Sequence, residues 1–171
     1  GRASNARMKK LSNYAVQLRE KQKLKETYGL LERQFKRFFF MAQRMKGKTG
    51  DNLLILLETR LDNVLYRLHI ASSRQQARQL VLHRHVLVNG HTVNIPSYIL
   101  KKDDVITLKE GSKKLISVLE SLKRVSTDGI PSWLELNPDE VRAVVKDMPA
   151  RKDLVYPGTI NEQLVVELYS K

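Results

Sequence analysis

The spacing of apolar residues predicts an amphipathic helical segment in the first quarter of the chain. From Leu24 onward, apolar side chains recur every three or four residues, which places them on one side of an α-helix. The stripe consists of Leu24, Tyr28, Leu31, Phe35, Phe38, Met41 (or Ala42) and Met45. Gly29 is expected to divide the stripe into two helices or to bend it.

The residues before this stripe are expected to form an extended or mobile basic arm. Residues 1–10 show no apolar period, and they carry Arg2, Arg7, Lys9 and Lys10. Ser12 then offers a cap for the first helix, and Leu11 is placed as its hydrophobic staple.

A wider apolar face between Leu53 and Leu68 predicts one further helix, whose width implies burial against more than one element. Ser72 or Ser73, each with a glutamine three residues later, predicts a capping box at the start of the next helix, which is expected to end near His83. The dipeptide Asn89-Gly90 lies between two apolar runs and predicts a β-hairpin. Residues 61–93 therefore form a compact module of two helices and a hairpin.

The rest of the chain predicts short strands and helices. Strands are expected at residues 105–108, 133–136 and 141–145, a short helix at 115–125, and a connector at 148–158. Residues 160–169 fit either a helix or a strand, and a helix is favoured.

The charge balance adds a class of partner to this picture. The 171 residues contain 31 Lys and Arg against 18 Asp and Glu, a net charge of +13. Such an excess indicates a polyanionic partner, nucleic acid first and an acidic membrane surface second. Residues 1–48 hold 14 of the basic residues and three acids, whereas residues 129–171 are net negative. The positive charge is therefore concentrated in the N-terminal quarter, and the C-terminal quarter is expected to have a different role from binding a polyanion.

Several other classes of site are excluded or disfavoured. The absence of cysteine excludes disulfides and cysteine metal sites, and no apolar run approaches the roughly 20 residues of a membrane helix. His83, His85 and His91 have no nearby carboxylate that would favour a metal site. Residues 46–50 lack the earlier glycine and the strand of a phosphate-binding loop. Asp62 is interpreted as the structural partner of an arginine and not as a general base.

Three runs of sequence carry a resemblance to a known family. They are LSNYAVQLREKQKLKETYGLLERQFKRFF, NLLILLETRLDNVLYRLHIASSRQQARQLVLHRHVLVNGHTVNIPSY and INEQLVVELYSK. In this order, and nearly end to end, the chain resembles bacterial-type ribosomal protein S-four of the small subunit. The module at residues 61–93 is similar to the RNA-binding domain named after that protein.

The resemblance implies an α+β fold of two domains. A helical RNA-binding domain should comprise residues 1–58, completed by residues 146–171. An α/β domain at residues 59–145, with two helices plus a β-hairpin and a small, mostly antiparallel sheet, should be inserted between them. Many family members also carry an N-terminal extension, sometimes with zinc-binding cysteines, and this sequence is expected to lack it.

The resemblance also implies a non-enzymatic function in the small ribosomal subunit, in the cytoplasm or in an organelle. The protein should bind small-subunit ribosomal RNA early in assembly, with no cofactor. Arg7, Lys9 and Lys10 should lie near the channel that messenger RNA enters, which makes messenger RNA a further expected partner. The C-terminal residues Asn161, Glu162, Gln163 and Tyr169 should face the neighbouring ribosomal protein S-five, at a contact that influences decoding accuracy.

The candidate RNA-binding residues fall into two groups, one in each expected domain. The helical group consists of Arg2, Arg7, Lys9, Lys10, Tyr14, Arg19, Lys21, Lys23, Arg33 and Arg37. The inserted group consists of Arg60, Arg67, Ser73, Arg74, Arg78, His83 and Asn89. Basic side chains of this kind bind phosphates, while folded RNA is recognised largely by its shape.

Three alternatives use the same features. The chain could be an assembly or stress factor that binds ribosomal RNA transiently, or the RNA-binding part of an RNA-modifying enzyme. The cationic and apolar faces of residues 19–45 would also suit a helix on a membrane surface, but the following helices offer a protein partner for the apolar stripe.

Overall fold

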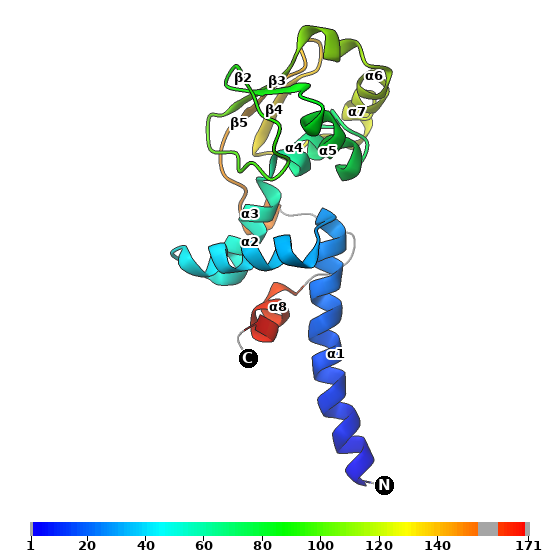
Figure 1. Cartoon of the computed structure of the whole chain (residues 1–171), viewed down its shortest axis with the longest axis vertical. Coiled ribbons are helices and arrows are strands. Elements are labelled where there is room, and N and C mark those ends of the chain that lie inside the picture. Colours follow the sequence, from blue (N-terminus) through cyan, green and yellow to red (C-terminus); the bar gives the residue numbers. More distant parts are fainter. Residues whose placement is uncertain (1, 154–160, 170–171) are drawn as a thin grey trace. The chain divides into compact units, whose positions relative to one another are not determined.

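The computed structural model describes the backbone of residues 2–153 and 161–169, and the side chains of residues 13–153 and 161–169. The chain divides into two compact units, Gly1–Leu54 with Val155–Lys171, and Ile55–Leu154. The first unit is helical, and the second combines helices with an antiparallel sheet, so the expected α+β class is confirmed (Figure 1).

The first unit contains α1 (Arg2–Tyr28), α2 (Glu32–Arg44), the start of α3 (Thr49–Glu58) and α8 (Glu162–Tyr169). Helix α1 ends at Gly29, as expected. There the backbone turns to φ 65°, Gly29 N donates to Glu26 O at 3.1 Å and Leu30 N donates to Lys25 O at 2.9 Å. This pair of bonds is the Schellman ending, whose left-handed residue is usually glycine.

Two expectations for the N-terminal segment are wrong. The backbone is helical from Arg2, so residues 2–10 are not an extended arm and Ser12 does not begin a helix. Alanine, methionine, arginine and lysine are good helix formers, and no glycine or proline lies between Arg2 and Tyr28 to stop the helix. The side chains of Arg2, Arg7, Lys9 and Lys10 lie outside those that the structure describes.

The apolar stripe is confirmed at most of its positions. Leu24, Tyr28, Phe35, Phe38 and Ala42 are buried, together with Phe39. Leu31 is 73% exposed, because it precedes the first turn of α2 in an extended conformation, and Leu30 is buried in its place. Met41 and Met45 are exposed, so the core side of α2 is narrower than the stripe suggested.

The favoured helical state of the C-terminal segment is also confirmed, and α8 packs on α1 and α2 (Figure 1). The Tyr169 ring lies 4.6 Å from that of Phe39, and its hydroxyl donates to Glu32 at 2.9 Å. Lys21 and Lys25 of α1 pair with the same carboxylate at 3.0 and 2.9 Å. Glu32 of α2 therefore connects α1, α2 and α8.

The second unit is built on a five-stranded sheet in the order β2-β1-β3-β5-β4, with every neighbouring pair antiparallel. The strands are β1 (Val86–Val88), β2 (His91–Thr92), β3 (Val105–Leu108), β4 (Leu134–Asn137) and β5 (Arg142–Val145). The helices are the end of α3, α4 (Leu61–Arg67), α5 (Arg74–Leu82), α6 (Ile116–Leu122) and α7 (Val125–Asp128), with short 3₁₀ turns η1 (Glu110–Lys114) and η2 (Arg151–Asp153). Figure 1 shows α4 to α7 gathered beside the sheet.

One core joins these helices to the sheet. Leu65 of α4, Val81 of α5 and Val118 of α6 belong to the same buried cluster as Ile106 of β3 and Ala143 of β5. Alternate residues of β3 and β5 contribute to it, as expected for strands with one buried face. The Asn89-Gly90 hairpin is confirmed, with φ of 51° and 81° at its two turn residues, the values that a type I′ turn requires.

Other boundaries differ from the sequence expectation. Residues 53–68 form not one helix but two, because the chain is extended at Arg60 (φ −60°, ψ 141°) and pairs with Ile99. Leu61 N donates to Tyr98 O and Leu100 N donates to Thr59 O, so backbone bonds to residues 98–100 stabilise the break between the two helices. The spacing of apolar residues continues across the break and therefore does not reveal it. Residues 115–125 likewise contain α6 and the start of α7, and β4 and β5 each begin one residue later than expected.

None of the described helices has the length and apolar character needed to cross a membrane.

We predict that Glu32 makes the first unit sensitive to acid. Burial alone would raise the pKa of Glu32, but hydrogen bonds from Lys25, Lys21 and Tyr169 lower it from 4.5 to about 2. A carboxyl whose pKa falls on folding stabilises the fold above its unfolded pKa and loses this effect as pH falls through the folded pKa. The free energy of unfolding should therefore decline between about pH 5 and pH 2 by more in the parent chain than in Glu32→Gln. Urea titrations at several pH values measure this difference, and equal declines in the two proteins would contradict it.

Candidate nucleic-acid interface

One group of basic side chains lies on and beside α4 and α5, where arginines are hydrogen-bonded to buried residues. The fixing residues are Glu58, Asp62 and Asn63, all buried. Each of these three residues accepts a hydrogen bond from the Nε–H of at least one arginine. We call these three residues, with Arg60, Arg67, Arg74 and Arg78, the arginine network.

Asp62 is the centre of this network. Its side chain is 1% exposed, and it accepts two hydrogen bonds from Arg60, Nε to Oδ1 at 3.0 Å and Nη2 to Oδ2 at 2.9 Å. Arg78 of α5 donates its Nε to Oδ2 of the same carboxylate at 3.0 Å. The interpretation of Asp62 as a structural partner of an arginine is therefore confirmed.

Arg67 and Arg74 are held by the other two residues. Arg67 Nε donates to Glu58 Oε1 at 2.7 Å. Arg74 Nε donates to Asn63 Oδ1 at 3.0 Å, and its guanidinium carbon lies 4.5 Å from the centre of the Tyr66 ring. Glu58, Asn63 and Tyr66 were not among the candidate residues. Their only sequence signal is that they lie within nine residues of one another among the arginines.

Two members of the inserted group make structural contacts within the second unit. Arg60 is 2% exposed, because its guanidinium turns inward to Asp62, so its side chain does not present itself to a phosphate. Asn89 accepts from Val105 N and donates to Asp104, both at 2.9 Å, and thereby fastens the hairpin turn to the start of β3.

The other members of this group lie at or near the surface. Ser73 caps α5, with its hydroxyl accepting from Gln76 N at 3.0 Å, and Gln76 reaches back to Ser72 N. His83 is exposed, and His85 contacts the Ser112 hydroxyl. Within the described part of the chain, no three His, Asp or Glu side chains are grouped in a way that could hold a metal ion.

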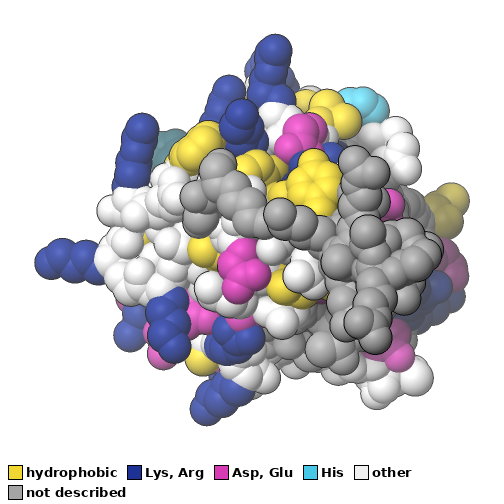
Figure 2. Space-filling model, turned by 90° about the horizontal axis from the view of Figure 1, so that it is seen from below, with side chains coloured by type: hydrophobic (Ala, Val, Ile, Leu, Met, Phe, Trp, Pro, Cys, Tyr) yellow, Lys and Arg dark blue, Asp and Glu magenta, His cyan; other side chains and the backbone are white. Residues whose placement is uncertain are grey.

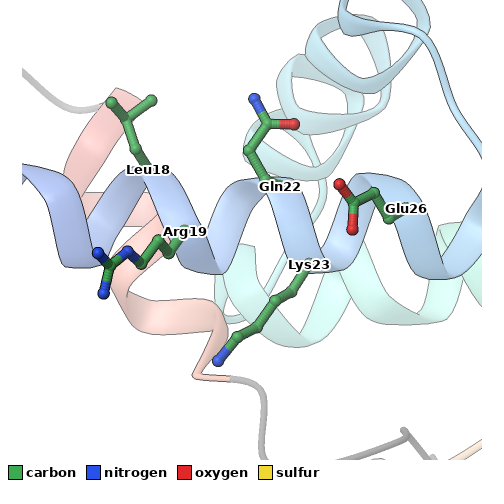
Figure 3. Close-up of a pocket in the computed structure, with 5 residues that line it drawn as sticks. All are labelled: Leu18, Arg19, Gln22, Lys23 and Glu26. Atoms are coloured by element: carbon green, nitrogen blue, oxygen red, sulfur yellow. The ribbon is translucent and has the colours of Figure 1, made fainter.

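A second basic surface lies on α1 and α2. Tyr14, Arg19, Lys23, Arg33 and Arg37 are exposed, and Lys21 is half-buried against Glu32. In Figure 3, Arg19 and Lys23 project from the same side of α1, one turn apart, beside an open depression that Leu18, Gln22 and Glu26 complete.

The outer side of α2 forms a shallow basic groove. It is lined by four cations and two apolar side chains, namely Arg33, Lys36, Arg37, Phe40, Met41 and Arg44. Figure 2 shows lysine and arginine side chains projecting from the surface, with apolar patches between them. Lys36, Phe40, Met41 and Arg44 were not candidates, although the run Phe38–Phe40 already required one ring nearer the surface than the others.

The C-terminal candidates for a protein partner divide into two kinds. Glu162 is buried beside Gly50, where an added Cβ would come within 2.8 Å of the Glu162 Cγ, and Tyr169 packs on Phe35 and Phe39. Asn161 and Gln163 are exposed. Burial and hydrogen bonding to Glu32 raise the pKa of Tyr169, so its phenol keeps its proton.

We predict that Asp62→Ala destabilises the second unit by about 3–5 kcal/mol, because it leaves the Arg60 guanidinium buried without its carboxylate. Adding Arg60→Met to Asp62→Ala should recover part of this loss, since no buried charge then remains at position 60. Chemical denaturation measures both variants, and Asp139→Ala, at an exposed position, is the control. A double variant as unstable as Asp62→Ala would contradict the assignment of the cost to the buried arginine.

Comparison with known proteins agrees with the geometry. Residues 1–58 match the ribosomal protein S4/S9 N-terminal domain family, and residues 59–106 match the S4 domain family. The chain is 56% identical over 162 residues to small ribosomal subunit protein uS4 of Geobacter sp. strain M21, a match that covers 95% of this chain and 77% of that protein.

Two further relatives carry the same name. The protein of Desulfotalea psychrophila is 53% identical over 171 residues, covering 100% of this chain and 80% of that protein. The protein of Neisseria meningitidis serogroup C is 51% identical over 166 residues, and the match covers 97% of this chain and 80% of that protein. The predicted resemblance is thus confirmed, and the chain belongs to the uS4 family of small ribosomal subunit proteins.

Proposed function

We propose that this chain is a structural constituent of the small ribosomal subunit and that it binds small-subunit ribosomal RNA. The observation that carries the proposal is the arginine network. Arginines held by buried acceptors lose little side-chain freedom on binding, so more of each phosphate contact appears as affinity. The family membership supplies the class of RNA.

Binding is electrostatic in this proposal. Each lysine or arginine that meets a phosphate releases counterions, which makes affinity fall as salt rises. Folded RNA offers mainly phosphates, 2′-hydroxyls and a characteristic shape. Rigid basic side chains on helices suit that target better than a pocket for one base.

The two units contribute different kinds of basic surface. Residues 1–48 carry most of the net charge, and among the described side chains Arg19, Lys23, Arg33 and Arg37 are exposed along α1 and α2. The second unit carries fewer cations, but its arginines are fixed through Nε. We assign the long-range electrostatic attraction of RNA to the surface of the first unit. The arginines of the second unit would fix the position and orientation of the protein on the RNA.

The finer assignments of the family are part of the same proposal. The protein would bind early in subunit assembly, with the basic start of α1 near the messenger RNA channel. Its C-terminal helix would face ribosomal protein S-five and thereby influence decoding accuracy. Asn161 and Gln163 are exposed and suit such a contact, whereas Glu162 and Tyr169 would act indirectly by fixing α8.

We predict that Arg74→Ala with Arg78→Ala weakens binding to small-subunit ribosomal RNA by roughly ten-fold or more and lowers the salt slope by about two, because two phosphate contacts are lost. Filter binding at several salt concentrations measures both quantities. Asp62 keeps its two bonds to Arg60 in this variant but loses its pair with Arg78, so thermal unfolding is measured to show that the variant is folded at the temperature of the assay. Lys113→Ala with Lys123→Ala removes the same charge from η1 and the end of α6 and serves as the control. Equal binding by the two double variants would exclude α4–α5 as an RNA surface.

We also predict one copy of the protein per small subunit after subunits are washed in high salt and sedimented, because a structural constituent is retained by its assembled RNA. Quantitative mass spectrometry of the subunit peak measures the ratio. A ratio well below one would instead favour a transient assembly or stress factor. Protein that sediments free of subunits while RNA is being modified would favour the enzyme-associated alternative.

A further inference from the structure

Two residues that carry no charge contact the guanidinium of Arg74 in the arginine network. Arg60, Arg67 and Arg78 are each paired with a carboxylate, at 2.9, 2.7 and 3.0 Å. Arg74 donates its Nε to the neutral amide of Asn63 and lies over the ring of Tyr66. An amide and a ring orient a guanidinium without cancelling its charge.

The amide of Asn63 is itself fixed in direction. Asn63 is fully buried, and its Nδ2 donates to the Glu58 carbonyl oxygen at 2.6 Å. Only the NH₂ group of the amide can make that bond, so the Oδ1 must point the other way, toward Arg74 Nε. The bend between α3 and α4 therefore sets the position of an acceptor for α5.

The Tyr66 ring supplies the second constraint. The Arg74 guanidinium carbon lies 4.5 Å from the ring centre, and that of Arg67 lies 5.9 Å from it. A guanidinium prefers to stack on an aromatic face, which restricts the remaining rotation about the long side chain. Tyr66 is half-buried in α4, so its ring offers a firm surface.

We infer that Tyr66 and Asn63 are positioning residues that hold the Arg74 guanidinium in one orientation for contact with the phosphate backbone of the RNA, so that its planar geometry, and not only its charge, contributes to recognition. The inference rests on the proposed function, because it requires that Arg74 meets RNA.

Four variants test it, with the small-subunit ribosomal RNA of Geobacter sp. strain M21, transcribed in vitro, as the probe. Tyr66→Leu should weaken binding about three- to ten-fold, because an arginine that is no longer held must be ordered on binding. Its salt slope should stay as in the parent, since no charge is lost, whereas Arg74→Ala should lower the slope by about one. Tyr66→Phe keeps the ring and should bind within about two-fold of the parent.

The sharpest variant is Arg74→Lys, which keeps the charge but lacks the guanidinium that Asn63 and Tyr66 orient. It should bind about three- to ten-fold more weakly than the parent, with an unchanged salt slope. Tyr98→Leu, which removes another surface tyrosine of the same unit, is the control for nonspecific loss. Thermal unfolding of each variant shows whether it is folded at the temperature of the assay.

The outcomes separate this inference from the proposed function. If Arg74→Lys and Tyr66→Leu bind like the parent while Arg74→Ala binds weakly, charge alone suffices and the positioning role is overturned. If Arg74→Ala also binds like the parent, both the positioning role and the assignment of this surface to RNA fail. If Tyr66→Leu unfolds, Arg74→Lys and Tyr66→Phe still decide the question.

Discussion

The second unit depends on a carboxylate that is almost wholly removed from water. Asp62 at 1% exposure would be strongly destabilising alone, and it is tolerated because Arg60 and Arg78 surround it with charged hydrogen-bond donors. Arg60 can reach it only because the chain leaves the helical conformation at residue 60. The helix break, the buried ion pair and the placement of α5 are thus one arrangement, and the arginines of α4 and α5 are its outward side.

In the first unit a carboxylate also pairs with several donors, but it is less buried than Asp62. Glu32 is partly exposed, and it gathers Lys21, Lys25 and the Tyr169 hydroxyl from two other helices. These contacts restrain α8 on α1 and α2, and the aromatic group of Phe35, Phe39 and Tyr169 supplies the apolar part of the attachment. In both units an acidic side chain gathers basic ones, which lowers the local repulsion among cations in a chain of net charge +13.

Features encoded by a few neighbouring residues were predictable from the sequence. The end of α1 at Gly29, the Ser73 cap and the Asn89-Gly90 turn each follow from local backbone chemistry. The helix break at Arg60 was not predictable in this way, because it is stabilised by pairing with residues 96–100, about forty positions away. Arg60 is buried and Leu31 is exposed because each lies where the backbone is extended before a helix. The type of a residue, apolar or charged, does not predict such a position. For the candidate site, charge identified the arginines of α4 and α5, and Asp62 was interpreted as an arginine partner from the sequence, but the contacts of Glu58, Asn63 and Tyr66 with the arginines are visible only in three dimensions.

The attachment of α8 to α1 has a consequence for the order in which the protein can mature. The residues of the second unit are contiguous and precede α8, so they can fold while the chain is still being synthesised. Helix α1 is synthesised before the second unit, whereas its partners Asn161, Glu167 and Tyr169 are synthesised after that unit. A nascent chain therefore holds the cationic helix α1 before the helix that packs on it has been made.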